Sequence, residues 1–289
     1  MCKIYNKLFV LWIALMGSCA QTKDELTPPP TSGETQAVSI NLTRGVQDDF
    51  ITAGVESYTI FVYRNNREDK SLFSEQQVSV NQSNITLQFS LGDNFNIFAV
   101  ANASSVTGKD NFNDVTLHLN PLSDSQVWMT EVTSFTSDKS VTELDMSMQR
   151  IVARVEFAPA ESPEDLANQT LFDTLLLNFT NTSDSYKVSD GSVTIKDQNL
   201  TVSGADGYKG GFYTFATTTA EESMLGISYL KGGEIVNNTA GALETGIKYS
   251  ANNRYFMTVP ILANEYVETP WSRSSTGVLE GLTVNQTSL

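Results

Sequence analysis

The chain has 289 residues, and its 33 acidic residues outnumber its 18 lysines and arginines, which gives a formal net charge of −15. The length is sufficient for two domains of ordinary size, each with its own hydrophobic core. A chain this acidic is repelled by nucleic acid and by anionic lipid headgroups, so we expect no nucleic-acid partner and no membrane contact through the protein surface.

The N-terminal segment predicts a lipoprotein signal peptide over residues 1–18. Lys3 and Lys7 precede an apolar run, Leu8–Met16, which is followed by small residues and then Cys19. A positive start, a short apolar core and small residues at the cut are typical of secretory signals, and this run is too short to span a bilayer. The pattern resembles the bacterial lipobox, in which the cysteine is acylated. We therefore expect Cys19 to carry lipid, such as palmitate, and to anchor the protein.

Residues 19–36 predict a lipidated, extended tether, because Pro28-Pro29-Pro30 stands among Thr, Ser, Gly and Gln. Within this segment Lys23-Asp24-Glu25 resembles the surface-export signal of Bacteroidetes lipoproteins, and a plain solvated tether is the alternative. The other cysteine, Cys2, lies in the predicted signal. We therefore expect neither an intrachain disulfide nor a cysteine-based metal site in the mature protein.

From Ala37 onward the dominant pattern is an alternation of apolar and polar residues with period two, which is typical of β-strands. Helix is scarce: Ser162 as N-cap and Pro163 as first residue predict only one or two turns, ending near Thr170. Strands are expected at Val38–Leu42, Glu56–Arg64, Gln77–Val80, Asn84–Leu91, Asn94–Ala101, Val193–Ile195, Leu200–Val202, Gly211–Ala216, Met224–Leu230 and Tyr255–Ile261. The expected fold class is all-β, with two tandem antiparallel β-sandwich (transthyretin-like) domains behind a lipidated tether.

A change of phase interrupts the alternation near the middle of the chain. Apolar residues keep one phase up to Met148 and the opposite phase from Ile151 onward, with the slip at Gln149-Arg150. A β-bulge shifts the phase in this way, and so does a strand that leaves one core and enters another. We favour the second interpretation and expect an N-terminal sandwich over residues 37–155 and a C-terminal sandwich over residues 156–289.

This interpretation predicts which side chains of residues 150–157 point into the second core and which lie on the opposite face of the strand. Arg150 and Arg154 are expected on the face opposite the core, where two cations in so acidic a chain pair with carboxylates. The side chains expected to point into the second core are those of Ile151, Ala153, Val155 and Phe157.

The residues offer little for catalysis. The only histidine, His118, alternates with the apolar Leu117 and Leu119 and is expected on the exposed face of a strand. No G-x-S-x-G motif accompanies it, and the acidic loop 108–114 lacks the spacing of a calcium loop. A pair of carboxylates is the one catalytic arrangement left open. We expect no enzyme activity, no cofactor and no metal.

Two strands resemble those of the Bacteroidetes type V fimbrial lipoprotein family. In Met148–Phe157 an arginine precedes an apolar pair, then alanine, a basic residue and alternating valine, and Val55–Tyr63 ends in an aromatic residue. The lipobox, the acidic residues after it, the tether and two β domains complete the likeness, which covers the layout of the whole chain but only these two strands in sequence. The family includes stalk fimbrillins and FimB-like anchor and accessory subunits.

The resemblance implies that such subunits travel as lipoproteins. Stalk subunits are then cut after an arginine by a surface protease and lose their first strand, and a strand from a neighbouring subunit fills the groove. Arg44, which follows the first expected strand and precedes Gly45, is the candidate processing site. An ordinary arginine at a strand end is the alternative, since anchor subunits keep their first strand and their lipid.

These observations favour an outer-membrane, surface-exposed lipoprotein that is a structural subunit of fimbriae, as an anchor, an accessory or a stalk subunit. Its expected partners are other fimbrial subunits, through strand donation, and the membrane, through the N-terminal lipid. The alternative is a surface glycan-binding lipoprotein of a nutrient-uptake system. That function requires exposed aromatic residues on one face, and the sequence shows no clear row of them. The choice among stalk, anchor and tip, and any ligand on a host or bacterial surface, stay open.

Overall fold

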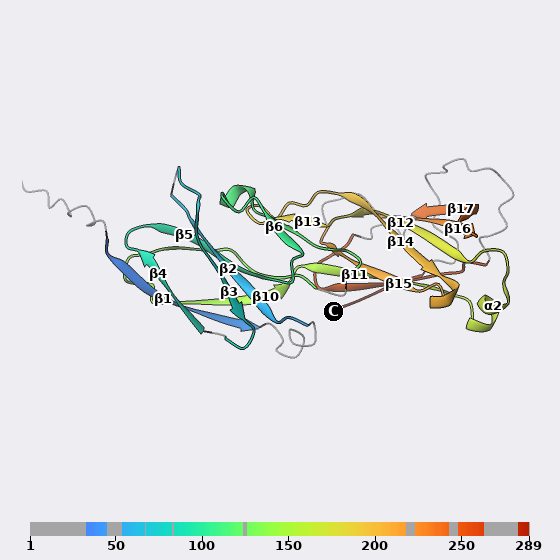
Figure 1. Ribbon diagram of the computed structural model, residues 1–289, viewed down its shortest axis with the longest axis horizontal. Helices are drawn as coiled ribbons and strands as arrows, with labels where there is room; N and C mark the ends of the chain where they lie inside the picture. The colour runs from blue at the N-terminus through green and yellow to red at the C-terminus, as the bar shows by residue number, and fades with distance from the viewer. Residues whose placement is uncertain are drawn as a thin grey trace, which may run out of the picture. The chain divides into compact units, whose positions relative to one another are not determined.

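The computed structural model describes residues 33–44, 54–66, 68–82, 84–123, 126–217, 223–242, 248–262 and 283–288. Residues 33–289 form one compact unit. In its described part this unit is built of β-strands, two 3-10 turns and one short α-helix (Figure 1). The all-β fold class is therefore confirmed. The predicted signal peptide and most of the tether, Cys19 included, lie outside the described residues.

The N-terminal sandwich is one eight-stranded sheet with the order β3-β2-β5-β8-β10-β1-β4, and β9 pairs with β5. Because β3 and β4 follow each other in the chain but lie at opposite ends of this order, the sheet curls over and its two ends face each other. Its strands are β1 (Thr35–Arg44), β2 (Ser57–Arg64), β3 (Leu72–Ser79), β4 (Asn84–Ser90), β5 (Asn94–Ala101), β8 (Trp128–Thr130), β9 (Thr133–Thr136) and β10 (Glu143–Arg150).

The curled sheet encloses the N-terminal core, and the predicted alternation decides which side chains enter it. Along β2, Tyr58, Ile60 and Val62 all belong to this core, as expected for residues two apart. The intervening Phe61 and Tyr63 are also buried, in a second cluster that we call the joint cluster. The strands that cover this side form a small sheet in the order β13 (Ser185–Lys187), β7 (Thr116–His118) and β6 (Ser105–Thr107).

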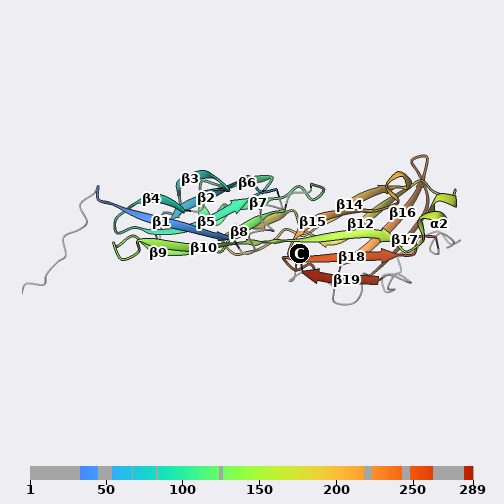
Figure 2. The same cartoon turned by 90° about the horizontal axis from the view of Figure 1, so that it is seen from below.

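The C-terminal sandwich has two four-stranded sheets, and the C-terminal core lies between them. Phe157, Leu177 and Tyr229 are among its fully buried side chains. The first sheet, of which β18 and β19 lie side by side in Figure 2, has the order β15 (Gly210–Phe215), β11 (Val152–Pro159), β18 (Asn253–Val259) and β19 (Thr283–Ser288). The second has the order β14 (Lys196–Ser203), β12 (Thr174–Thr182), β16 (Met224–Lys231) and β17 (Glu234–Ala242).

The expectation of purely antiparallel pairing is wrong at two places. β1 pairs with β10 and β11 pairs with β18 in parallel. Parallel neighbours need a long connection between them. The partners here are far apart in the chain, so the intervening strands provide that connection. The alternation along the chain does not reveal either parallel pair, because strands in parallel and in antiparallel pairs have the same period of two.

The change of phase marks the passage of the chain from one sheet to another. β10 ends at Arg150 in the N-terminal sheet, and β11 begins at Val152 in the C-terminal sandwich. Met148 belongs to the N-terminal core, whereas Val155 belongs to the C-terminal core. The expectation for Ile151 is wrong, because it packs against the joint cluster instead of the second core. The division at residues 155 and 156 stays a prediction, and β13 from beyond it pairs with β7 before it.

The local signal for the helix is confirmed. The α-helix α2 (Pro163–Asn168) has Ser162 as N-cap, whose hydroxyl accepts a hydrogen bond from the Asp165 N–H at 3.2 Å. The β16–β17 hairpin turns at Gly232 and Gly233, which have φ of 59° and 89°. Both φ values are positive, as a tight hairpin turn requires. The 3-10 turns are η1 (Phe112–Asp114) and η2 (Gly204–Asp206).

Candidate functional site

The first strand, β1, is an inner strand although it begins the described chain. It pairs in parallel with β10 from Ser39 to Arg44 and antiparallel with β4 from Thr35 to Asn41 (Figure 1). Without β1, β10 would become an edge of the sheet, and β4, already the end strand, would lose its pairing partner. We call the space that β1 fills between β10 and β4 the β1 slot.

The inner face of β1 is apolar and fully enclosed. Val38 and Ile40 have no exposed surface, and Leu42 is only 6% exposed. Gln36 lies on the same face and is also buried, and its side-chain oxygen accepts hydrogen bonds from the Ser137 hydroxyl at 3.0 Å and from the Lys139 N–H at 2.9 Å. The strand therefore begins at Thr35, within the segment expected as tether, because this buried amide extends the pattern of alternate residues.

The turn that receives Gln36 is ordered by its own hydrogen bonds. Asp138 accepts from the Ser140 N–H at 2.9 Å and from the Ser140 hydroxyl at 2.5 Å. These two bonds favour the ionised carboxylate and hold the pKa of Asp138 below its usual range. Gln36 is not among the residues predicted from the sequence, although its phase with Val38 and Ile40 is the signal that could have revealed it.

The outer face of β1 is polar and adds less. Asn41 donates to the Asp145 carboxylate at 3.1 Å, and Asn84 donates to the Asn41 side-chain oxygen at 2.8 Å. Exposed hydrogen bonds of this kind contribute about 0.5–1.5 kcal/mol each. Burial of one large aliphatic side chain contributes about 1.5–3 kcal/mol. The three apolar side chains of the inner face therefore dominate the attachment of β1 to the slot.

An emptied β1 slot would have a defined chemistry. Loss of β1 exposes the facing backbone groups of β10 and β4 and the hydrophobic contacts of Val38, Ile40 and Leu42. A replacement strand must restore the backbone hydrogen bonds and provide apolar side chains at alternate positions.

Of the two site residues predicted from the sequence, the structure describes Arg44 but not Cys19. Arg44 is the last residue of β1 and faces Met148 of β10 in the register, so it belongs to the strand and does not follow it. Cys19 and Gly45 lie outside the described residues. The candidate processing point thus falls where the described strand ends.

The two arginines near the change of phase, Arg150 of β10 and Arg154 of β11, have different environments. Arg154 is on the outer face of β11 and pairs with Glu156, with 3.4 Å between Arg154 Nε and Glu156 Oε1, as predicted. The prediction for Arg150 is wrong: its side chain is only 6% exposed and donates to Asn252 Oδ1 at 2.9 Å. Its guanidinium also lies 4.7 Å from the centre of the Trp128 ring. Because β10 keeps its phase up to its last residue, Arg150 is on the side of the buried Met148.

The structure also describes His118, the side chain considered above for catalysis. His118 is half-buried in β7, and its Nε2 lies 2.9 Å from the Thr107 hydroxyl, while Leu117 is fully buried. Within the described ranges there is no group of three or more histidine, cysteine or acidic side chains able to hold a metal ion. Nor is any helix in that part of the chain long and apolar enough to cross a membrane.

Several solved structures share this fold at low sequence identity. A candidate adhesin from Bacteroides ovatus has a TM-score of 0.55 at 12% identity, over 79% of this chain and 88% of its own. A candidate polysaccharide-binding protein from Bacteroides thetaiotaomicron has a TM-score of 0.53 at 14% identity, over 78% of this chain and 92% of its own. A candidate adhesin from the same species has a TM-score of 0.51 at 11% identity, over 89% of this chain and 99% of its own.

The likeness to these proteins is one of fold: the chain shares its β-sandwich architecture with these Bacteroides proteins. No model of a known protein family matches the sequence, and no curated protein matches it either.

Proposed function

We propose that this protein is a structural subunit of a surface fimbria, lipid-anchored at Cys19 in the outer membrane, and that it joins other subunits through the β1 slot. The observation that carries the proposal is the position of β1, an inner strand held mainly by Val38, Ile40 and Leu42. Its fold likeness to candidate adhesins supports a role at the cell surface. The function is structural and needs no catalysis.

The proposal gives β1 and Arg44 distinct tasks. β1 fills the slot during export and folding, so that no unpaired edge is open to aggregation. Cleavage after Arg44 then cuts β1 from the rest of the chain, and a strand of a neighbouring subunit takes its place. If the cut is not made, the subunit keeps both its first strand and its lipid and acts as the anchor of a fibre.

Cleavage after Arg44 should make β1 exchangeable. We expect protein cut by an arginine-specific protease, and then sequenced from its new N-terminus, to begin at Gly45. The cut protein should take up a labelled peptide of residues 35–44, because only non-covalent contacts now hold β1. Gel filtration with fluorescence detection measures the uptake.

Two controls make this exchange test specific. Arg44→Ala protein should resist the cut and take up no peptide, since its β1 stays covalently joined. A peptide with Ile40→Asp should not enter the slot, because it would place an unpaired charge at a fully buried position. Equal uptake of the two peptides would disprove exchange at the β1 slot. Retention of Cys19 and its lipid in all the surface protein would assign the chain to the anchor class.

Replacement of Cys19 by serine should abolish acylation, because serine lacks the thiol that takes the lipid. We expect unprocessed precursor or misplaced protein, whereas the parent is labelled in cells fed an alkyne fatty acid. In-gel fluorescence after coupling to an azide dye measures the label. A second serine variant, at Cys2 in the predicted signal, should label like the parent. Equal labelling of the Cys19 variant and the parent would contradict lipidation at this residue.

A further inference from the structure

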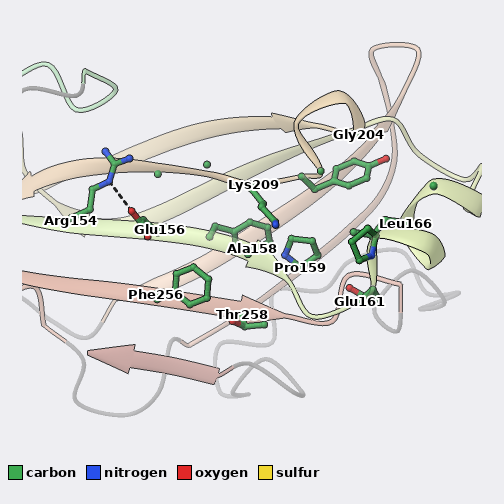
Figure 3. A pocket seen from close by; sticks show the side chains of 17 residues that line it. Arg154, Glu156, Ala158, Pro159, Glu161, Leu166, Gly204, Lys209, Phe256 and Thr258 are labelled. Atoms are coloured by element: carbon green, nitrogen blue, oxygen red, sulfur yellow. Dashed lines mark hydrogen bonds and ion pairs between the residues drawn. The ribbon is translucent and has the colours of Figure 1, made fainter. Parts of the chain in front are cut away.

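A groove opens on the outer face of the β15-β11-β18-β19 sheet, on the side away from the C-terminal core (Figure 3). Its volume is about 810 Å³, within the range of ligand pockets in proteins. β11 forms the floor from Arg154 to Pro159, Phe256 of β18 lies on one side and Leu166 of α2 lies at one end. Five residue steps along a strand make the floor about 16 Å long, which suits a chain-like ligand.

The groove depends on a glycine of β15, Gly211, which pairs with Glu156 of β11. A Cβ atom added to Gly211 would lie 2.6 Å from the Val155 carbonyl oxygen and 3.0 Å from Glu156 Cγ. A larger residue here would therefore push the side chains of the floor out of position. Ala158, the next outward residue of β11 after Glu156, is also small. The small residues leave an open surface where other positions of a sheet carry packed side chains.

The charged groups at one end of the groove are held in fixed positions. Glu156 accepts from Arg154 Nε at 3.4 Å and from Arg254 Nε at 2.8 Å. The Arg154 guanidinium lies 4.6 Å from the centre of the Tyr213 ring, which holds it flat. Its two terminal nitrogens make no hydrogen bond with the described residues, and they point away from Glu156 (Figure 3). They are suited to bind a carboxylate through two parallel hydrogen bonds.

The other end of the groove has an unused acceptor. Glu161 Oε1 accepts from the Leu262 N–H at 2.7 Å. Glu161 Oε2 is buried and receives no hydrogen bond from the described residues. A buried oxygen without a donor is unfavourable, so a ligand hydroxyl placed there would be bound favourably.

The groove is less acidic than the chain as a whole. Among its lining residues, Arg154 and Lys209 balance the carboxylates of Glu156 and Glu161, and Arg254 beside it also pairs with Glu156. The lining is therefore neutral in a chain whose formal net charge is −15. An anionic ligand is repelled less here than by the chain as a whole.

A peptide strand is a poor fit to this part of β11. The Ala160 N–H donates to the Val259 carbonyl at 2.9 Å, so the preceding residue turns its backbone toward the opposite edge of β11. The pairing of that edge with β15 reaches only as far as Phe157 and Gly210. The residue before Ala160 is Pro159, which has no N–H to donate. A peptide added as a strand at this edge would find no N–H at Pro159 with which to pair, as is usual for protected sheet edges.

We propose that this groove binds an acidic oligosaccharide, that is, a chain of sugars carrying carboxylates. A sugar ring has an apolar face to pack on Phe256, which is 37% exposed, and on Leu166. Its hydroxyls suit the free oxygen of Glu161, and its carboxylate suits Arg154 and Lys209. This binding goes beyond the proposed fimbrial role, because the groove and the β1 slot are built from different strands.

Isothermal titration calorimetry of the full mature protein with tetragalacturonate tests the proposal, with maltotetraose and a short polyglutamate as matched ligands. We expect tetragalacturonate to bind, and to bind more weakly as salt is raised. Maltotetraose lacks the carboxylates and polyglutamate lacks the sugar rings, so each should bind at least about tenfold more weakly. Phe256→Ala should weaken tetragalacturonate binding about tenfold or more, through loss of one buried aromatic contact.

Two further variants separate the groove from the rest of the surface. Arg154→Gln should bring the affinity for tetragalacturonate close to that for maltotetraose. Ile235→Ala, which removes a 57% exposed side chain on β17, should bind like the parent. Circular dichroism should show the same thermal transition for Phe256→Ala as for the parent. The proposal is overturned by no binding of tetragalacturonate, by equal binding of polyglutamate, or by unchanged binding in Phe256→Ala.

Binding and assembly can fail separately. The calorimetric test uses uncut monomer, so its result does not depend on exchange in the β1 slot. The Arg44→Ala variant should bind tetragalacturonate like the parent even where strand exchange is lost.

Discussion

Val155→Asp should unfold the C-terminal sandwich at the temperature where the parent protein is stable. Val155 has no exposed surface, and it lies on β11 between the buried Phe212 of β15 and Tyr255 of β18. The aspartate would place a charge in this core without a partner, which costs several kcal/mol. Because the whole stability of a domain is about 5–15 kcal/mol, this single change removes a large part of it.

The neighbouring Arg154→Gln provides the matched control for this prediction. Arg154 is on the opposite face of the same strand, where its side chain is 18% exposed and pairs with Glu156. Its replacement should lower the free energy of unfolding by no more than about 1 kcal/mol. Urea denaturation followed by circular dichroism, together with limited proteolysis, measures both changes. Protease resistance of Val155→Asp equal to that of the parent, with Arg154→Gln digested readily, would show that the two faces are wrongly assigned.

Arg150→Ala should destabilise the passage between the two sandwiches. The Arg150 side chain is nearly fully buried, stacks on Trp128 and donates to Asn252, whose own N–H donates to the Val152 carbonyl at 2.9 Å. Alanine removes the packing of the long side chain and leaves the Asn252 oxygen without this donor. We expect the free energy of unfolding to fall by about 2–4 kcal/mol.

Arg150→Lys separates the charge of this side chain from its shape. Lysine keeps the charge but loses the flat guanidinium that stacks on the indole and forms the directed hydrogen bond. The stability of Arg150→Lys should therefore lie between that of Arg150→Ala and that of the parent. Urea denaturation gives the stability, and tryptophan fluorescence reports the environment of Trp128. An alanine variant with the stability and the emission of the parent would contradict a structural role for Arg150.

The local elements were predictable because their signals act over a few residues. The alternation in β2 and β5 shows which side chains share a face, and Ser162-Pro163 is a helix start whatever the rest of the chain does. The phase change after Gln149 likewise indicated a strand that passes from one core to another. The apolar alternation of Val38–Leu42 was sufficient to predict a strand there, although β1 runs from Thr35 to Arg44.

The sequence by itself therefore determined many of the strands, one buried face of each and the all-β class, since these follow from side-chain chemistry at a spacing of two. It missed β12 and β19, and the strand expected at Val193–Ile195 is wrong, because only an isolated bridge forms at Val193. Only the tertiary structure decided that β1 lies between β10 and β4, that Arg150 is buried against Trp128, and that Arg154, Phe256 and Glu161 border one groove. These features join residues that are distant in the chain. Strand order and parallel pairing depend on how the sheets close over their cores, and a local pattern carries no information about that closure.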